Sequence, residues 1–217
     1  MSERVATEKH VEVSIGDLRF PGTLGSPPGA RGLVLFAHGS GSSRLSPRNV
    51  HVARGLHQAG LATLLFDLLT EREDRVYGTR FDITLLSERM LGAAEWALAE
   101  PATSALRPGF FGASTGAAAA LRAAAKLGPA VFAVVSRGGR PDMTGAVLAD
   151  VRSPTLLIVG ERDLTVLGLN RRAFAQLRAE KELAVVPGAT HLFEEPGALE
   201  EVTRLAADWF VRHLGAP

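Results

Sequence analysis

Cysteine is absent from the whole sequence of 217 residues. Its absence excludes disulfide bonds, metal sites built from thiolates and a cysteine nucleophile. Also lacking is any run of about 18 consecutive apolar residues, the length that a membrane-spanning helix needs. The first residues carry no apolar core of the kind found in signal peptides. We therefore expect a cytoplasmic protein without a membrane partner.

The sequence also lacks an excess of positive or negative charge. The sequence has 24 Lys and Arg against 23 Asp and Glu, a formal net charge of +1, so no global field attracts nucleic acid. Hydrophobic residues make up 46% and charged residues 22%, as in ordinary globular proteins. Because the composition does not shift along the chain, we predict one domain over residues 1–217. A monomer and a homodimer are both compatible with the sequence.

Short apolar runs alternate with helix-like segments along most of the chain. The first two runs, residues 10–15 and 18–24, flank Gly16-Asp17 and predict an antiparallel hairpin. Further strands are predicted at 33–36, 61–66, 109–111, 131–135, 155–159 and 183–186, and helices at 49–59, 82–99, 115–127, 143–150, 166–179 and 197–214. This α/β alternation predicts a parallel sheet with helices on both faces, which binds its ligands at the carboxyl ends of the strands.

One motif carries the sharpest chemical signal. The run Gly112-Ala113-Ser114-Thr115-Gly116 follows a predicted strand and opens an alanine-rich helix. This is the strand, tight turn and helix in which a nucleophile elbow projects its serine above the sheet. The glycines leave space for the strained turn, so we predict Ser114 as a nucleophile. The alternative is a serine that only caps the helix.

A serine hydroxyl is a poor nucleophile at neutral pH and needs a base, which a third residue orients. Asp163 and His191 each follow a predicted strand, in loops at the edge of the sheet where Ser114 is expected. The order Ser, Asp, His is the one found in hydrolases with a nucleophile elbow. We predict His191 as the general base and Asp163 as the residue that orients it, with Glu161 as a weaker rival for the second role. The alternative for Asp163 is a helix cap or a surface carboxylate.

Acyl transfer also needs donors to the developing oxyanion, one of which is the backbone N–H just after the nucleophile. Here that residue is Thr115. The second donor is predicted in the loop after the first parallel strand, His38-Gly39-Ser40-Gly41, with Ser40 as the donor. A loop of this composition can also cradle phosphate, but the lysine of a P-loop is missing.

Together these motifs resemble the dienelactone-hydrolase-like group of the α/β-hydrolase superfamily, over about residues 30–214. The resemblance implies an eight-stranded, mostly parallel sheet and a covalent acyl-enzyme on serine that needs no metal and no cofactor. Dienelactone hydrolases proper carry cysteine where Ser114 stands, which argues against dienelactone itself as the substrate. Many relatives carry a lid domain after the sixth strand, but the segment from Arg137 to Thr155 has room for only one short helix, so we expect no lid domain.

Several arginines are predicted at the same edge, although the chain has almost no net charge. Arg44 and Arg48 follow the predicted oxyanion loop, and Arg137 and Arg140 follow the sixth predicted strand. Guanidinium groups pair well with carboxylate or phosphate. We therefore predict substrate-binding residues for an anionic ligand among Arg44, Arg137 and Arg140. The alternative is that these side chains hold loops through acidic neighbours such as Asp142.

The function predicted from these residues is hydrolysis of a small carboxylic ester or lactone. Ser114 attacks the carbonyl carbon, His191 transfers the proton, and water releases the acyl group. The partner is then a small-molecule ester. A thioesterase or a small peptidase of the same fold is an alternative. A different class is a non-catalytic homologue that uses its pocket only to bind a ligand.

Overall fold

The chain folds around one eight-stranded sheet in the computed structural model, which describes residues 6–215. The strands follow the order β1-β2-β4-β3-β5-β6-β7-β8 across the sheet. β2 is antiparallel to both of its neighbours, and all pairs from β4 to β8 are parallel. The strands are β1 (Thr7–Ile15), β2 (Leu18–Ser26), β3 (Gly32–Ala37), β4 (Ala62–Phe66), β5 (Arg107–Ala113), β6 (Val134–Arg137), β7 (Thr155–Gly160) and β8 (Lys181–Val186).

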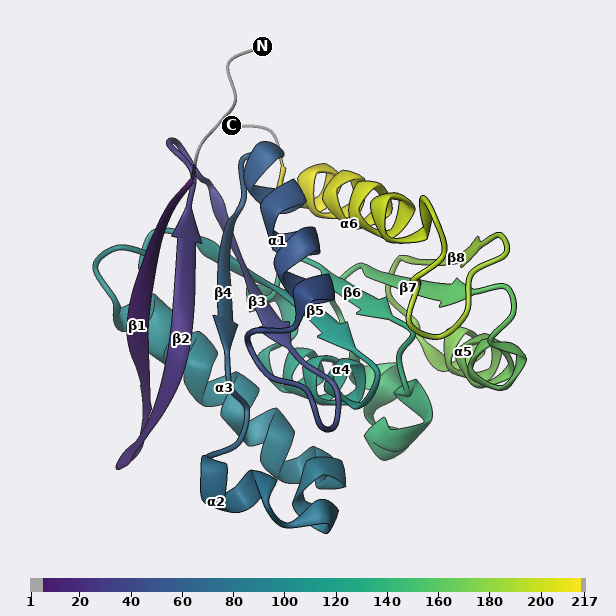
Figure 1. Cartoon of the computed structure of the whole chain (residues 1–217), viewed down its shortest axis with the longest axis horizontal. Helices are drawn as coiled ribbons and strands as arrows, with labels where there is room; N and C mark the ends of the chain where they lie inside the picture. The colour runs from purple at the N-terminus through teal and green to yellow at the C-terminus, as the bar shows by residue number, and fades with distance from the viewer. Residues whose placement is uncertain (1–5, 216–217) are drawn as a thin grey trace.

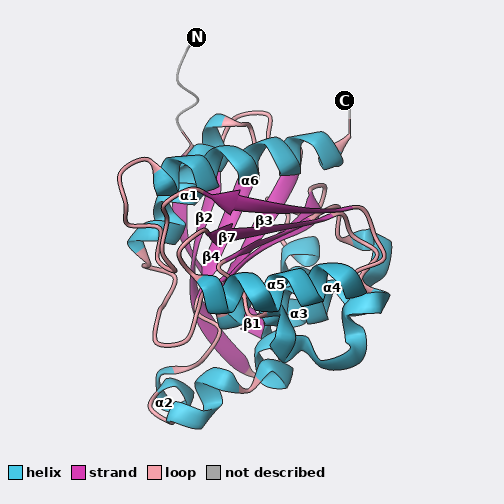
Figure 2. Cartoon of the chain, turned by 90° about the vertical axis from the view of Figure 1, so that its right-hand side faces the viewer, coloured by secondary structure: helices cyan, strands magenta, loops and turns pink. Residues whose placement is uncertain are grey.

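Helices cover both faces of the sheet (Figure 1, Figure 2). α1 and α6 lie on one face, and α3, α4 and α5 lie on the other. The α-helices are α1 (Pro47–Gln58), α2 (Glu71–Asp74), α3 (Ile83–Ala99), α4 (Thr115–Leu127), α5 (Leu164–Gln176) and α6 (Ala198–Leu214), and three-ten turns cover Tyr77–Phe81, Gly128–Ala130 and Pro141–Asp150. Over residues 6–215, none of the helices has the length and apolar character needed to cross a bilayer.

This architecture confirms the predicted fold class. The hairpin around Gly16-Asp17 is confirmed as β1 and β2, which pair from Thr7 with Ser26 to Ile15 with Leu18. α4 covers the residues predicted for it, and its alanine-rich stretch is buried against the sheet. As predicted, the described segment between β6 and β7 holds no lid domain, and it consists of short three-ten turns.

One strand lies later than predicted. The apolar run at 131–135 predicts a strand, but β6 covers Val134–Arg137. The neighbouring strand β7 starts only at Thr155, because Pro154 before it has no N–H to donate to a sheet. The first part of the run is buried and already bonds to β5, since Phe132 N–H donates to the carbonyl of Pro108 and Ala133 accepts from Phe110 N–H. Hydrophobicity alone therefore does not mark where pairing with β7 begins. Arg137 is therefore the last residue of β6 and not part of the following loop.

The helix predicted at 143–150 is also different. Residues Pro141–Asp150 form three-ten turns that are interrupted at Gly145, where φ is 74° and ψ is −151°. This backbone conformation is open to glycine and ends the first turn. The chain between β4 and α3 is more structured than predicted, since Thr70 and Glu73 form a capping box at the start of α2.

The close packing of α4 on the sheet depends on two glycines. A Cβ at Gly116 would lie 2.5 Å from the carbonyl oxygen of His38 and nearer still to that of Ala37. A Cβ at Gly112 would lie 2.7 Å from the backbone nitrogen of Ala117. These neighbours are backbone atoms, which cannot move aside without displacing a strand or a helix. The absence of both side chains therefore lets α4 begin directly beside the carboxyl end of β3.

Gly116→Ala should accordingly destabilise the fold strongly. The added methyl group must push α4 away from β3, and such overpacking should lower the free energy of unfolding by about 3 kcal/mol. Gly78→Ala is the matched control, because a Cβ at Gly78 would meet nothing within 4 Å. Urea denaturation followed by circular dichroism compares the two variants. Equal midpoints for both would contradict this account of the packing.

Candidate active site

Ser114 lies in the turn between β5 and α4, with a backbone φ of 50° and ψ of −120°. A positive φ is strained for a residue with a side chain and persists where the surrounding structure holds it. The N–H of Ser114 donates to the carbonyl of Arg137 at 3.2 Å, and its own carbonyl accepts from the N–H groups of Ala117 at 3.1 Å and Arg140 at 3.0 Å. Its side chain forms no capping hydrogen bond, so the hydroxyl does not act as a helix cap.

Asp163 and His191 come together in the loops after β7 and β8. The Nδ1 atom of His191 lies 2.6 Å from Oδ2 of Asp163. The Asp163 side chain is 13% exposed, whereas that of His191 is 38% exposed. When the neutral imidazole donates from Nδ1 to the carboxylate, Nε2 carries no proton. Nε2 is the atom through which a general base takes a proton from a serine.

Further contacts hold these two residues in place. The other carboxylate oxygen of Asp163 accepts from the N–H of Val166 at 3.4 Å, at the start of α5. Phe193, two residues after His191, has a φ of 55° and a buried ring, which anchors the loop. Glu161 accepts instead from a backbone N–H in the loop after β8, at 2.8 Å. Of the two carboxylates considered from the sequence, only Asp163 meets His191.

Ser114 and His191 line one cavity of about 240 Å³. Its walls are formed by the loop after β3, the amino end of α1 and the carboxyl ends of β5 and β6. Gly138, which follows the last residue of β6, lies beside the imidazole, since a Cβ there would be 3.5 Å from Nδ1 of His191. No acidic residue lines the cavity among residues 6–215. The site is therefore a small cavity lined by Ser114, His191, two arginines and otherwise uncharged residues.

The predicted oxyanion donors are neighbours, and a hydrogen bond that was not predicted joins them. The N–H of Ser40 donates to Oγ1 of Thr115 at 2.9 Å. Thr115 is the first residue of α4, so its own N–H has no acceptor within the helix. Thr115 thus offers a backbone donor directly. Ser40 can serve an oxyanion only if its N–H leaves the threonine hydroxyl or shares it.

His38 joins the predicted oxyanion loop, which follows β3, to the loop after β4. Its Nδ1 lies 3.0 Å from the carbonyl oxygen of Gly39, and its Nε2 accepts from the N–H of Leu68 at 3.0 Å. A ring that donates through Nδ1 and accepts through Nε2 is neutral, and burial correspondingly lowers the pKa of His38. The motif beginning at His38 identifies this loop in the sequence. The contact of the ring with Leu68 could not be predicted, because it depends on where β4 lies in the sheet.

The arginines predicted to bind substrate lie in different surroundings. Arg44 pairs with Asp67 at 3.0 Å and lines a separate cavity. Arg140 forms two hydrogen bonds to Asp142, at 2.9 and 2.8 Å, which is the alternative that the sequence suggested. Of the three predicted arginines, Arg137 alone lines the cavity of the serine and the histidine.

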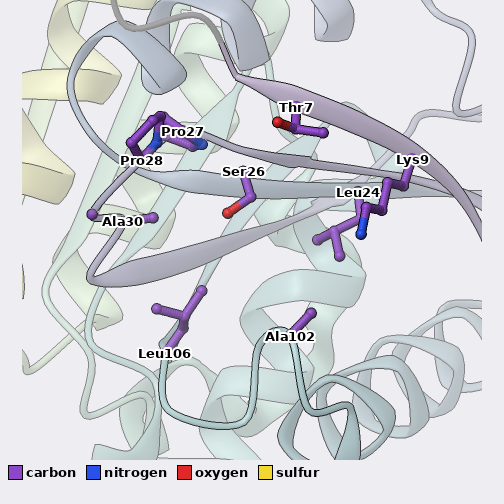
Figure 3. Close-up of a pocket in the computed structure, with 10 residues that line it drawn as sticks. Thr7, Lys9, Leu24, Ser26, Pro27, Pro28, Ala30, Ala102 and Leu106 are labelled. Atoms are coloured by element: carbon purple, nitrogen blue, oxygen red, sulfur yellow. The ribbon is translucent and has the colours of Figure 1, made fainter.

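A larger cavity, of about 450 Å³, lies near the amino ends of β3 and β5, away from the carboxyl ends that carry Ser114. Figure 3 shows the residues that line it. It is lined by the start of β1, the end of β2 and the residues before β3 and β5, among them Ala30 and Leu106. The length of β5 separates this cavity from Ser114, and no histidine or acidic residue of the described chain lines it. Nor do the described residues contain a cluster of three or more His, Asp or Glu side chains suited to a metal ion.

The sheet, with a serine on a strained turn after β5, defines an α/β-hydrolase fold. No protein-family model matches the sequence. Est1E from Butyrivibrio proteoclasticus shares the fold, with a TM-score of 0.78 at 16% identity, over 94% of this chain and 98% of that chain. The crystal structure of dienelactone hydrolase from Anabaena variabilis has a TM-score of 0.95 at 53% identity, over 97% of this chain and 100% of that one. The chain therefore belongs to the dienelactone hydrolase-like family.

A curated relative from Mycobacterium tuberculosis carries a different name. It is called "Putative phosphoribosyl transferase" and is 55% identical over 210 residues, which are 97% of this chain and 47% of the relative. The chain thus spans about half the length of these curated relatives.

Ser114 should react covalently with a fluorophosphonate probe, because a serine beside a histidine–carboxylate pair is activated as a nucleophile. Peptide mass spectrometry should find the label on Ser114. Ser114→Ala should abolish the labelling, whereas Ser42→Ala, which changes another serine of the cavity, should label like the wild type. Circular dichroism checks that both variants are folded. Undiminished labelling of Ser114→Ala would disprove the assignment of the nucleophile.

Proposed function

We propose that this protein is a serine hydrolase that cleaves a small carboxylic ester or lactone through a covalent acyl-enzyme on Ser114. The observation that carries the proposal is the 2.6 Å contact between His191 Nδ1 and Asp163 Oδ2 in the loops beside the Ser114 cavity. Membership of the dienelactone hydrolase-like family supports it. The mechanism uses only the chain's own residues and water.

In the first step, Oγ of Ser114 attacks the carbonyl carbon of the ester while Nε2 of His191 takes the hydroxyl proton. The carbonyl oxygen becomes an oxyanion, and the intermediate collapses when the alcohol leaves with the proton from His191. In the second step a water molecule attacks the acyl group, again giving its proton to His191. Collapse then breaks the bond from Oγ of Ser114 to the acyl carbon, returns the proton from His191 to Oγ and releases the carboxylic acid. Asp163 keeps the imidazole in the required tautomer and stabilises its charged form.

The oxyanion would be held by two backbone N–H groups. Thr115 provides the first, because its amide lies at the start of α4, where the helix dipole also favours negative charge. Ser40 provides the second when its N–H exchanges the Thr115 hydroxyl for the oxyanion, starting from the 2.9 Å contact. This exchange costs little, since one hydrogen bond replaces another and the new acceptor is charged.

The size of the cavity favours small substrates over peptides or long acyl chains. At about 240 Å³ it is smaller than the pockets that take drug-sized ligands. A thioester would use the same residues and the same steps, so turnover of a thioester and of an ester with the same acyl group has to be compared. The match to the relative called a phosphoribosyl transferase covers only 47% of that relative. Ser114 and His191 in the cavity support acyl transfer instead.

Asp163→Asn should leave the protein folded but lower turnover of 4-nitrophenyl acetate by about two to four orders of magnitude, because the imidazole takes the wrong tautomer. Glu161→Gln is the matched control. Its carboxylate lies in the same loop and accepts a backbone N–H, which an amide oxygen can also do. A larger loss of turnover in Glu161→Gln than in Asp163→Asn would show that the wrong carboxylate has been assigned.

We also predict that the enzyme is not activated at a lipid–water interface. The described connection between β6 and β7 contains three-ten turns and no lid, so no apolar cover has to open. Rates on tributyrin should rise smoothly as its concentration passes the solubility limit. A sharp increase when droplets form would mean that another segment covers the site.

A further inference from the structure

Asn170 is a fully buried polar residue on the side of α5 that faces the core. Its Nδ2 atom donates to two main-chain carbonyls, that of Val166 at 2.8 Å and that of Gly139 at 3.0 Å. Because both partners are acceptors, the nitrogen of the amide has to face them. Oδ1 is buried without a hydrogen-bond partner among residues 6–215, which costs stability. The two hydrogen bonds of Nδ2 are therefore what distinguishes Asn170 from an apolar residue at this position.

The bond to Gly139 leaves α5 and reaches the loop after β6. Gly138 and Gly139 follow the last residue of β6, and Gly138 has a φ of 52°. A pair of glycines gives the backbone more conformational freedom than any other pair of residues. The N–H of Gly138 donates to the carbonyl of Ile158 at 2.8 Å, and Asn170 holds the carbonyl of Gly139. The amide thus anchors the most flexible part of this loop.

This loop contacts both the nucleophile turn and the imidazole. On one side of Gly139, the N–H of Arg140 donates to the carbonyl of Ser114 at 3.0 Å and so helps to hold the strained turn. On the other side, a Cβ at Gly138 would lie 3.5 Å from Nδ1 of His191, so the backbone there packs on the ring. A shift of the Gly139 carbonyl would therefore disturb the serine turn and the histidine together.

The second hydrogen bond of Asn170 leads to the carboxylate that orients the imidazole. Val166 accepts from Asn170 through its carbonyl, and its N–H donates to Oδ1 of Asp163 at 3.4 Å. Oδ2 of Asp163 lies 2.6 Å from Nδ1 of His191. One buried amide therefore joins the first turn of α5, which holds Asp163, to the loop after β6.

We propose that Asn170 is a positioning residue, whose amide ties α5 to the loop after β6. The tie fixes the turn of Ser114 relative to the pair of His191 and Asp163. This inference rests on the proposed ester hydrolysis for its catalytic meaning. Asn170 does not line the cavity of Ser114, so it acts on turnover through geometry and not through contact with the substrate. Misplacement of reacting groups by about 1 Å can lower a rate about 100-fold.

Two variants remove the bond to Gly139 in different ways. Asn170→Leu has the same branched shape but no donor. Asn170→Thr has one donor, a hydroxyl that in a helix bonds to the carbonyl four residues earlier, here Val166, and so leaves Gly139 without a donor. In both variants kcat on 4-nitrophenyl acetate should fall about 10- to 100-fold, because the reacting groups are misplaced. KM should change less than about threefold, since the substrate never contacts Asn170.

Thr103→Val is the matched control. Thr103 is also buried, and its Oγ1 donates to the main-chain carbonyl of Ala97 at 2.6 Å, in the connection between α3 and β5. The variant loses a hydrogen bond of the same kind at a distance from the site, so its thermal midpoint should fall as in the Asn170 variants. Its kcat should stay within about twofold of the wild type, because no reacting group moves. Circular dichroism checks that all variants are folded.

Hydrogen exchange of the backbone tests the tie without any substrate. When Gly139 loses its donor, the loop should open more often, and the N–H of Arg140 should exchange at least about tenfold faster relative to amides in the middle of α4. This change is expected in both Asn170 variants and not in Thr103→Val. NMR follows the exchange of the single amide.

The outcomes separate this inference from the proposed function. Unchanged kcat in both Asn170 variants, a loss that appears only in KM, or an equal fall of kcat in Thr103→Val would overturn the positioning role. Unfolding of both Asn170 variants would show that the residue supports the fold itself and would overturn it as well. If the wild type hydrolyses no ester, the proposed function fails, and exchange at Arg140 decides the inference alone. Faster exchange then supports the tie, and unchanged exchange overturns it.

Discussion

The geometry of the candidate site depends on one close approach, in which the first turn of α4 lies against the carboxyl end of β3. Gly116 makes this possible, because any side chain there would overlap the carbonyl oxygens of Ala37 and His38. The same approach brings the loop after β3 to Ser114, since a Cβ at Gly39 would lie 3.2 Å from Cβ of Ser114. Both the strained serine and the free amides at the start of α4 owe their positions to this contact.

The sequence could predict the residues that meet at this edge because parallel strands deliver their loops to the same place. Ser114, Asp163 and His191 each follow an apolar run that predicts a parallel strand. This position in the sequence was enough to predict that they lie at the same end of the sheet. The choice between Asp163 and Glu161 also had a local signal. Asp163 stands where α5 begins, and aspartate caps helices well, because its short side chain reaches the amides of the first turn. Glutamate does so poorly.

Other features of the site had no local signal. The Ser40 amide and the Thr115 hydroxyl are 75 residues apart in sequence, and Arg137 and Asn49 are 88 apart. Such contacts depend on how loops and helix ends meet across the sheet. The pairing of Arg140 with Asp142 could be predicted, because the two residues are only two positions apart in the sequence. The position of Arg137 could not be predicted either. The buried apolar run before β6 placed the predicted strand at 131–135, so Arg137 was expected in the following loop, whereas it is the last residue of β6.

Several costs to stability gather at the same edge. Ser114 and Phe193 each hold a positive φ, and such strain costs about 1–3 kcal/mol per residue. Arg137 adds a buried charge that no described carboxylate balances. Together these costs are comparable to the whole net stability of a typical domain, about 5–15 kcal/mol, so the well-packed sheet and α4 have to offset them. The positive φ of Ser114 and the buried charge of Arg137 do not improve packing, and both residues line one small cavity. The buried ring of Phe193 packs in the core and holds the loop that brings His191 to the same cavity. The costs therefore fall on residues that shape this cavity, while the sheet and α4 supply the stability that tolerates them.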